Sequence, residues 1–165
     1  MASGFTPKVG QVLLCDFGQF APAGPPYRGS SDFDRRIPPE MVKKRLVIVL
    51  NGRLSRQSCI VVPLSISHDP FKMDAGVNVE IPVSAICPLN YFKPCVRWAK
   101  ADCVHTVSNL RLAMPRNANG PVEWTIDLAL TQRIQRAAVR ALNAGSMLIP
   151  IDERALLIDA AKQLE

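Results

Sequence analysis

The sequence predicts a mainly β domain (α+β), a small antiparallel barrel or strongly curled sheet with C-terminal helices packed on it. Three observations predict this fold. The 165 residues fit one domain, since a domain of about 150 residues is common. Five or six short apolar runs follow one another with turns and no helix between them. From residue 125 the apolar residues change to a helical spacing. We therefore treat residues 1–165 as a single domain.

Each expected strand is a run rich in Val, Ile and Leu that ends at a turn or at a change in composition. The dipeptide Asn51-Gly52 is a strong hairpin signal, so we expect the second and third strands to turn there. In the fourth run apolar and polar residues alternate, which indicates one buried face. The expected strands are 9–17, 45–50, 58–64, 77–81, 96–104 and 106–112.

A long Pro-rich loop, residues 18–44, separates the first two strands. It holds five prolines and three glycines, a composition that supports neither a continuous strand nor a helix. Loops of this length are uncommon in compact domains and are usually functional lids or disordered inserts.

Residues 125–165 are expected to form two helices. In the first, Arg133, Arg136 and Arg140 lie opposite an apolar stripe, and Asn143 and Gly145 end the helix. The second helix starts near residue 152, and both should pack on the sheet. The stripe of the first helix is Leu130, Ile134, Ala137, Ala138 and Ala141.

The composition indicates a cytoplasmic globular protein that could bind a polyanion. The net charge is +6, and no apolar run is long enough for a membrane span or a secretion signal. The five cysteines suit reduced, mostly buried thiols. Cys95, Cys103 and His105 are of the residue types that bind zinc, but no C-x-x-C pair is present. We expect no metal and no cofactor.

Three cations lie where the long loop leads into the second strand and are candidates for binding phosphate. The guanidinium of Arg45 offers forked donors that match phosphate oxygens, and Lys43 and Lys44 add point charges. The alternative is that these cations only solvate the entry to the strand.

A second group of candidates lies on the strand expected at 96–104. Trp98, Lys100 and Asp102 have the same parity, so their side chains point the same way. On an exposed face Trp98 could stack a base, Lys100 hold a phosphate and Asp102 exchange a proton. On a buried face Trp98 is core and the other two form a solvated pair. Arg111 is a further basic candidate.

Ser65 ends the third strand and is followed by Ser67, His68 and Asp69. No G-x-S-x-G sequence supports a hydrolase triad, and triad members need not be neighbours in sequence. We therefore expect His68 to be an exposed loop residue and Ser65 to donate a hydrogen bond to a phosphoryl oxygen.

In this order, the segments VGQVLLCDF, PPEMVKKRLVIVL, CIVVPLS and WAKADCVHTVSNLRL resemble the PemK/MazF family of type II toxins over roughly residues 8–140. The resemblance is carried by Glu40 before Lys44 and Arg45, by the Val-Pro-Leu-Ser strand end, and by Lys100 with Asp102. It implies an SH3-like barrel, a homodimer, and a metal-independent endoribonuclease that cuts single-stranded RNA and is neutralised by a cognate antitoxin.

The resemblance also implies residue roles. Arg45 matches the family's catalytic arginine, and Ser65 takes the place of the Thr or Ser at the end of the neighbouring strand. Asp102 and Lys100 match the pair of an acidic and a basic residue that the plasmid-borne branch uses. The expected catalytic residues are therefore Arg45, Ser65 and Asp102, with Asp102 as the base. The expected substrate-binding residues are Glu40, Lys43, Lys44, Trp98, Lys100 and Arg111.

The chain departs from the family pattern at three points. Leu46 replaces the usual proline, Asn78 replaces a frequent histidine, and no histidine precedes Glu40. Two other functions therefore stay open: a protein-binding inhibitor of the CcdB type, acting for example on DNA gyrase, and a catalytically silent nucleic-acid-binding domain.

Overall fold

A computed structural model describes residues 6–18, 41–55 and 57–149. Most of the long loop, including Glu40, and the second expected helix therefore lie outside the described residues. Within the described part no helix is long and apolar enough to cross a membrane.

The described chain is mainly β, as predicted, and its strands pair antiparallel. The main sheet has the order β4-β5-β3-β2-β1-β7, and β6 also pairs with β3. Two short strands, β8 and β9, form a separate hairpin. The strands are β1 (Val12–Asp16), β2 (Lys44–Ser55), β3 (Ser58–Ser65), β4 (Asn78–Ile81), β5 (Arg97–Lys100), β6 (His105–Ser108), β7 (Leu112–Ala113), β8 (Arg116–Asn117) and β9 (Gly120–Pro121).

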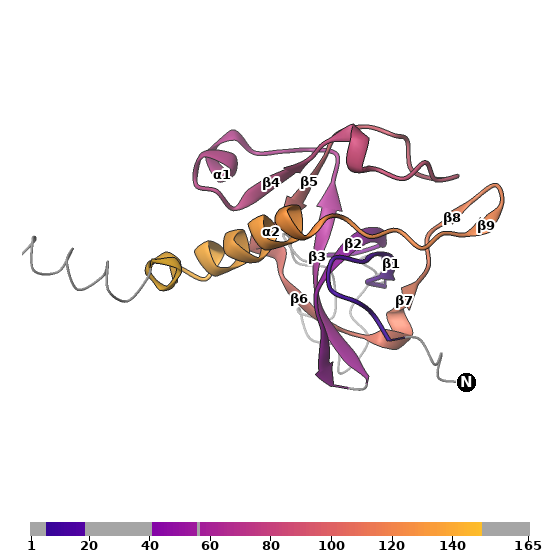
Figure 1. Cartoon of the computed structure of the whole chain (residues 1–165), viewed down its shortest axis with the longest axis horizontal. Helices are drawn as coiled ribbons and strands as arrows, with labels where there is room; N and C mark the ends of the chain where they lie inside the picture. Colours follow the sequence, from indigo (N-terminus) through magenta and orange to yellow (C-terminus); the bar gives the residue numbers. More distant parts are fainter. Residues whose placement is uncertain (1–5, 19–40, 56, 150–165) are drawn as a thin grey trace, which may run out of the picture.

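Strand β3 changes partner along its length, and this curls the sheet. Its first half pairs with β6 through residues 58–61, and its end pairs with β5 through residues 64 and 65. Figure 1 shows β6 beside one end of β3 and β5 at the other. The ring β1-β2-β3-β6-β7-β1 is hydrogen-bonded except between β6 and β7, which the 3-10 helix η3 (Asn109–Arg111) joins. In the described residues the curl is thus barrel-like, without a closed hydrogen-bond ladder.

The Asn51-Gly52 turn prediction is wrong. Strand β2 runs on to Ser55, and its register with β3 shifts between Val49 and Ser55. Gly52 has a different reason to lack a side chain: a Cβ there would collide with the backbone carbonyl of Pro7. Close approach of the chain before β1 therefore requires glycine at this position.

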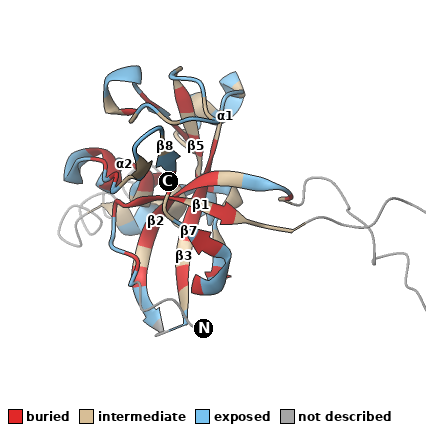
Figure 2. Ribbon diagram, turned by 90° about the vertical axis from the view of Figure 1, so that its right-hand side faces the viewer, coloured by how far each residue is buried: buried red, intermediate tan, exposed pale blue. Residues whose placement is uncertain are grey.

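The two faces of the central strands bury separate apolar clusters, because side chains alternate along each strand. Figure 2 shows the buried residues along β2 and β3. The inner cluster lies within the curl, and the outer cluster lies beneath helix α2 (Leu128–Ala141). The inner cluster is Leu13, Cys15, Val47, Val49, Cys59, Val61, Val107 and Leu112. The outer cluster includes Val12, Leu46, Ile48, Val62, Leu64, Val79, Ile81, Leu130, Ile134 and Ala137.

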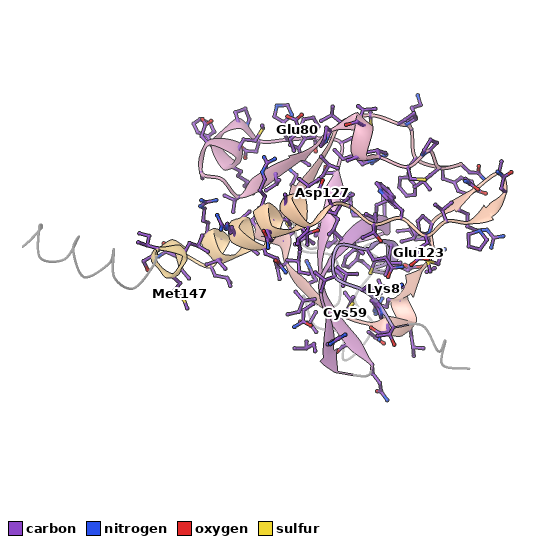
Figure 3. All side chains as sticks on the ribbon, in the orientation of Figure 1. Lys8, Cys59, Glu80, Glu123, Asp127 and Met147 are labelled. Atoms are coloured by element: carbon purple, nitrogen blue, oxygen red, sulfur yellow. The ribbon has the colours of Figure 1, made fainter. Side chains whose placement is uncertain are left out.

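Helix α2 confirms the first C-terminal helix. Asp127 caps it, because its side chain accepts a hydrogen bond from the Leu130 amide at 2.7 Å, and Figure 3 shows Asp127 at the start of the helix. Leu130, Ile134 and Ala137 are buried as predicted, whereas Ala141 is exposed at the end of the helix.

Smaller helices fill the connections. They are α1 (Pro70–Asp74) and the 3-10 helices η1 (Val83–Ala85), η2 (Ala101–Cys103) and η4 (Gly145–Leu148). Helix η2 corrects the strand expected at 96–104, since β5 ends at Lys100. All five cysteines are free thiols; Cys15 and Cys59 are buried, whereas Cys87, Cys95 and Cys103 are partly exposed, which corrects the expectation that most are buried.

Candidate active site

The inner face of β2 and β3 changes from apolar to polar at one end. Val47 pairs with Pro63, and both belong to this face. Two residues further along each strand the same face carries Arg45 on β2 and Ser65 on β3, because alternate residues point the same way. The predicted pair of a guanidinium and a hydroxyl thus flanks the end of the inner cluster.

Arg45 is half-buried, and a hydrogen bond from its Nε fixes the guanidinium. Its Nε donates to the carbonyl oxygen of Val42 at 3.1 Å. Within the described residues its two terminal nitrogens have no hydrogen-bond partner, so the fork is open for an anion.

The start of β2 is tied to the end of β1 by backbone hydrogen bonds. Lys43 donates its N–H to the carbonyl of Gly18 at 2.8 Å, and its own carbonyl accepts from Phe17 at 3.2 Å. Lys43 has φ 70, a left-handed conformation that this tight return requires. The long loop therefore leaves and returns next to Arg45.

Two predicted substrate-binding cations engage Asp16. Lys44 lies 3.8 Å from its carboxylate, and the Arg111 Nη1 donates to its carbonyl oxygen at 2.9 Å. Lys44 has the opposite parity to Arg45 and so points to the other face of β2. Both cations thus contact the last residue of β1.

Strand β5 extends the polar face from β3. Trp98 pairs with Ser65, and Lys100 pairs with Asn78 of β4. The ring of His68 stacks on Trp98 with centroids 4.5 Å apart. Trp98 is thus half-buried and covered on one side by the His68 ring. This lies between the two alternatives of a fully exposed Trp98 and a Trp98 in the core.

Ser65 and Asn78 differ in how their polar atoms are satisfied. The Ser65 hydroxyl lies 3.0 Å from the Ser67 hydroxyl and accepts from the Ser67 amide. Asn78 is 5% exposed, and neither atom of its side-chain amide has a hydrogen-bond partner in the described residues. The position that departs from the family pattern therefore carries a buried, unpaired amide.

Asp102 does not lie on β5 with Trp98 and Lys100, which corrects the shared-parity prediction. It lies on η2, and its carboxylate is 2.6 Å from the ammonium of Lys72 on α1. The hydrogen bond from Lys72 to this carboxylate raises the pKa of Lys72 above its ordinary value. Asp102 is therefore already paired with a cation.

Several charged side chains lie close enough to the Cys103 thiol to shift its pKa. Burial raises its pKa, and the charge of Asp102 raises it further, while Lys72, Lys100 and Arg45 lower it. Since one thiol responds to all four charges, Arg45 of β2 and the η2 charges lie within electrostatic range of one point.

His105, the first residue of β6, is a site residue that the sequence pattern did not single out except as a metal ligand. Its Nδ1 lies 2.7 Å from the carbonyl oxygen of Cys103, and its ring meets Phe17 edge-on at 5.3 Å. Among the described residues no cluster of three His, Cys, Asp or Glu side chains could hold a metal. We call Phe17, Arg45, Ser65, Cys103 and His105 the barrel mouth.

Comparisons with known proteins find similar chains among both curated proteins and solved structures. YifN of Escherichia coli (strain K12) is 43% identical over 148 residues, 90% of this chain and 99% of YifN. An uncharacterized protein of Haemophilus influenzae is 34% identical over 142 residues, 86% of this chain and 94% of its own. A solved mycobacterial endoribonuclease in complex with its cognate antitoxin matches with a TM-score of 0.47 and 15% identity, over 83% of this chain and 95% of that chain.

The family comparison is specific. A model of the PemK-like, MazF-like toxins of type II toxin-antitoxin systems matches residues 30–141, the part that holds β2 to α2. The resemblance read from the sequence is confirmed, and the chain belongs to the PemK-like, MazF-like toxin family.

Proposed function

We propose that this toxin is a metal-independent endoribonuclease that cuts single-stranded mRNA in the cytoplasm. The observation that carries the proposal is the strand register, which brings Arg45 of β2 and Ser65 of β3 to the same end of one sheet face, beside the strand that bears Lys100. A guanidinium, a hydroxyl and an ammonium along this face suit a phosphodiester, whose negative charge grows during cleavage.

The proposed reaction uses a nucleophile that RNA itself supplies. The 2′-hydroxyl loses its proton and attacks the adjacent phosphorus, and the bond from phosphorus to the 5′ oxygen breaks. The products are a 2′,3′-cyclic phosphate and a 5′-hydroxyl. This reaction needs a base, a proton for the leaving oxygen and donors for the phosphoryl charge.

The roles follow from the position of each side chain. The open fork of Arg45 and the ammonium of Lys100 bind phosphoryl oxygens, and the Ser65 hydroxyl donates to a third. Trp98 stacks a base once His68 gives way. Asp102 is the base that the resemblance suggests, and it must first leave Lys72.

The remaining predicted contacts belong to the rim of this site. Lys43, Lys44 and Arg111 lie around the ends of β1 and β2, where they would hold flanking phosphates. Glu40, outside the described residues, is proposed as a further contact to the RNA.

Two partners complete the proposal. Because the chain belongs to a family of type II toxins, a cognate antitoxin is expected to cover the face that binds RNA. The resemblance further implies a homodimer, which sedimentation of the purified protein would test.

A cleavage assay in EDTA tests the activity. The purified protein is incubated with a mixed-sequence RNA and with the same oligonucleotide carrying 2′-deoxy sugars. We expect the RNA alone to be cut, with 2′,3′-cyclic phosphate and 5′-hydroxyl ends identified by mass spectrometry.

Other outcomes would contradict the proposal. Cutting of the deoxy oligonucleotide would exclude attack by the 2′-hydroxyl. Binding of both oligonucleotides without cutting would indicate the silent nucleic-acid-binding domain. No interaction with either would leave the protein-binding inhibitor as the function to pursue.

A further inference from the structure

We propose that His105 is the general base that removes the proton from the attacking 2′-hydroxyl. This inference rests on the proposed endoribonuclease function and replaces Asp102 in that one step. Three features of the structure support it: the place of His105 on the sheet, the hydrogen bond that fixes its protonated nitrogen, and the ion pair that occupies Asp102.

The register of β6 places His105 at the barrel mouth. His105 pairs with Val61 of β3, and Val107 pairs with Cys59. Val61, Cys59 and Val107 belong to the inner cluster, so the side chain of His105 lies on the same face at the polar end. The edge-on contact with Phe17 then joins β6 to the end of β1, beside the start of β2.

The hydrogen bond to Cys103 decides which ring nitrogen of His105 can act as a base. A carbonyl oxygen can only accept, so Nδ1, at 2.7 Å, must carry the hydrogen. In the neutral ring Nε2 then has no hydrogen and presents a lone pair. In the part of the chain that the structure describes, Nε2 has no hydrogen-bond partner. The imidazole is therefore held in the tautomer that a base requires.

Asp102 is less suited to this step. Its carboxylate already holds the Lys72 ammonium at 2.6 Å, so taking a proton would break an ion pair. His105 needs no such rearrangement. The backbone carbonyl that Cys103 offers to His105 also links the ring directly to η2, which follows Lys100 at the end of β5.

The proton balance of the step is simple. Nε2 takes the 2′-hydroxyl proton as the oxygen bonds to phosphorus, and the ring becomes an imidazolium with a hydrogen on each nitrogen. The 5′ oxygen leaves with a proton from solvent water, and His105 returns its proton to solvent. No oxidant, reductant or second substrate is required.

The substitution His105→Asn tests the role of Nε2 while keeping the bond to Cys103. The asparagine amide nitrogen occupies a place close to Nδ1 and can still donate to the carbonyl, but it offers no basic nitrogen. We expect cleavage of the mixed-sequence RNA to fall by about 10²-fold to 10³-fold with RNA affinity and Tm nearly unchanged. Thr106→Ala, the exposed neighbour on β6, is the matched control and should cut like the wild type.

A modified substrate separates a base from an acid, while the unchanged Tm and RNA affinity separate a base from a structural role. Once the wild-type cut site is mapped, an oligonucleotide is made with sulfur in place of the leaving 5′ oxygen there. Sulfur leaves without a proton, so it rescues a variant that lacks an acid and does not rescue one that lacks a base. We expect the defect of His105→Asn to persist on this substrate.

The outcomes distinguish this inference from the proposed function. Wild-type cutting together with normal cutting by His105→Asn overturns the role of His105 and leaves the nuclease intact. Rescue by the sulfur substrate makes His105 an acid instead. A wild-type protein that leaves all RNA uncut overturns both the nuclease and this inference.

Discussion

The outer and inner faces of the central strands differ in how far their apolar character extends. On the outer face, apolar side chains from Leu46 to Leu50 of β2 meet helix α2 without interruption. On the inner face the apolar cluster stops at Val47, and Arg45 follows. The outer face of β2 thus contributes to stability, and the inner face of the same strand ends in a charged residue.

This difference indicates where function lies. A cation placed on the outer face would be buried beneath α2 at high cost. At the barrel mouth Arg45 stays half-buried and within reach of solvent. Substitutions at the polar end of the inner face should therefore lower activity, whereas substitutions on the outer face should lower stability.

The largest expected effect is that of Arg45→Ala on cleavage. Removing the guanidinium leaves the phosphoryl charge without its forked donor, and we expect a loss of about 10³-fold, equivalent to about 4 kcal/mol of transition-state stabilisation. Single-turnover cleavage of RNA measures it. Arg53→Ala removes an equal charge from an exposed position at the far end of β2 and is the control. Equal losses in both variants would mean that only net charge matters.

The next effect concerns the outer face. Ile134 of α2 is fully buried in the outer cluster, and Ile134→Ala should lower the free energy of unfolding by about 3 kcal/mol because it leaves a cavity. Urea denaturation measures this loss, with exposed Arg133→Ala as control. Cleavage per folded molecule should stay close to wild type. A comparable loss of activity in the folded protein would show that the two faces are coupled.

The contrast between the faces explains what sequence alone could predict. The apolar run at residues 45–50 predicted a strand, and the 3.6-residue period predicted α2 with Ile134 in its apolar stripe. Arg45 and Ser65 were candidate phosphate contacts on their residue types and positions, and the family resemblance added their catalytic roles. Their shared face follows from the register between β2 and β3, which no local pattern reveals.

The errors have physical reasons. Trp98, Lys100 and Asp102 alternate as in a strand, but the chain turns into η2 after Lys100, and this redirects Asp102 toward Lys72. The Lys72 partner lies 30 residues away in sequence. The role proposed for His105 depends on a backbone carbonyl, which a sequence pattern does not display.

A smaller effect should appear on the inner face at alkaline pH. Burial raises the pKa of Cys15 to about 12 and of Cys59 to about 11, from 9.0. The folded state then binds more protons than the unfolded state above pH 9. Stability is full below that value and falls as pH rises, by at most about 1.4 kcal/mol per pH unit for each thiol. Urea midpoints at pH 8, 9 and 10 measure this fall.

The double variant Cys15→Ala, Cys59→Ala is the control for the alkaline effect. It should be less stable than wild type at pH 8 because buried volume is lost. Its midpoint should nevertheless change less between pH 8 and 10. An equally steep fall in the variant would assign the alkaline sensitivity to other groups.

The smallest effect is expected from Lys72→Met, which frees Asp102. The ammonium and the carboxylate are partly exposed, with side-chain exposures of 46% and 25%, so the ion pair should contribute less than about 1 kcal/mol to stability. The variant also tests whether Asp102 or His105 is the base. If Asp102 were the base, releasing its carboxylate from a cation should speed cleavage. With His105 as the base the single-turnover rate at saturating RNA should stay within about two-fold of wild type, because the proton acceptor is unchanged. A clear acceleration by Lys72→Met that is lost again in Lys72→Met, Asp102→Asn would return the base role to Asp102, and it would place the reacting phosphate nearer to η2 than to β6.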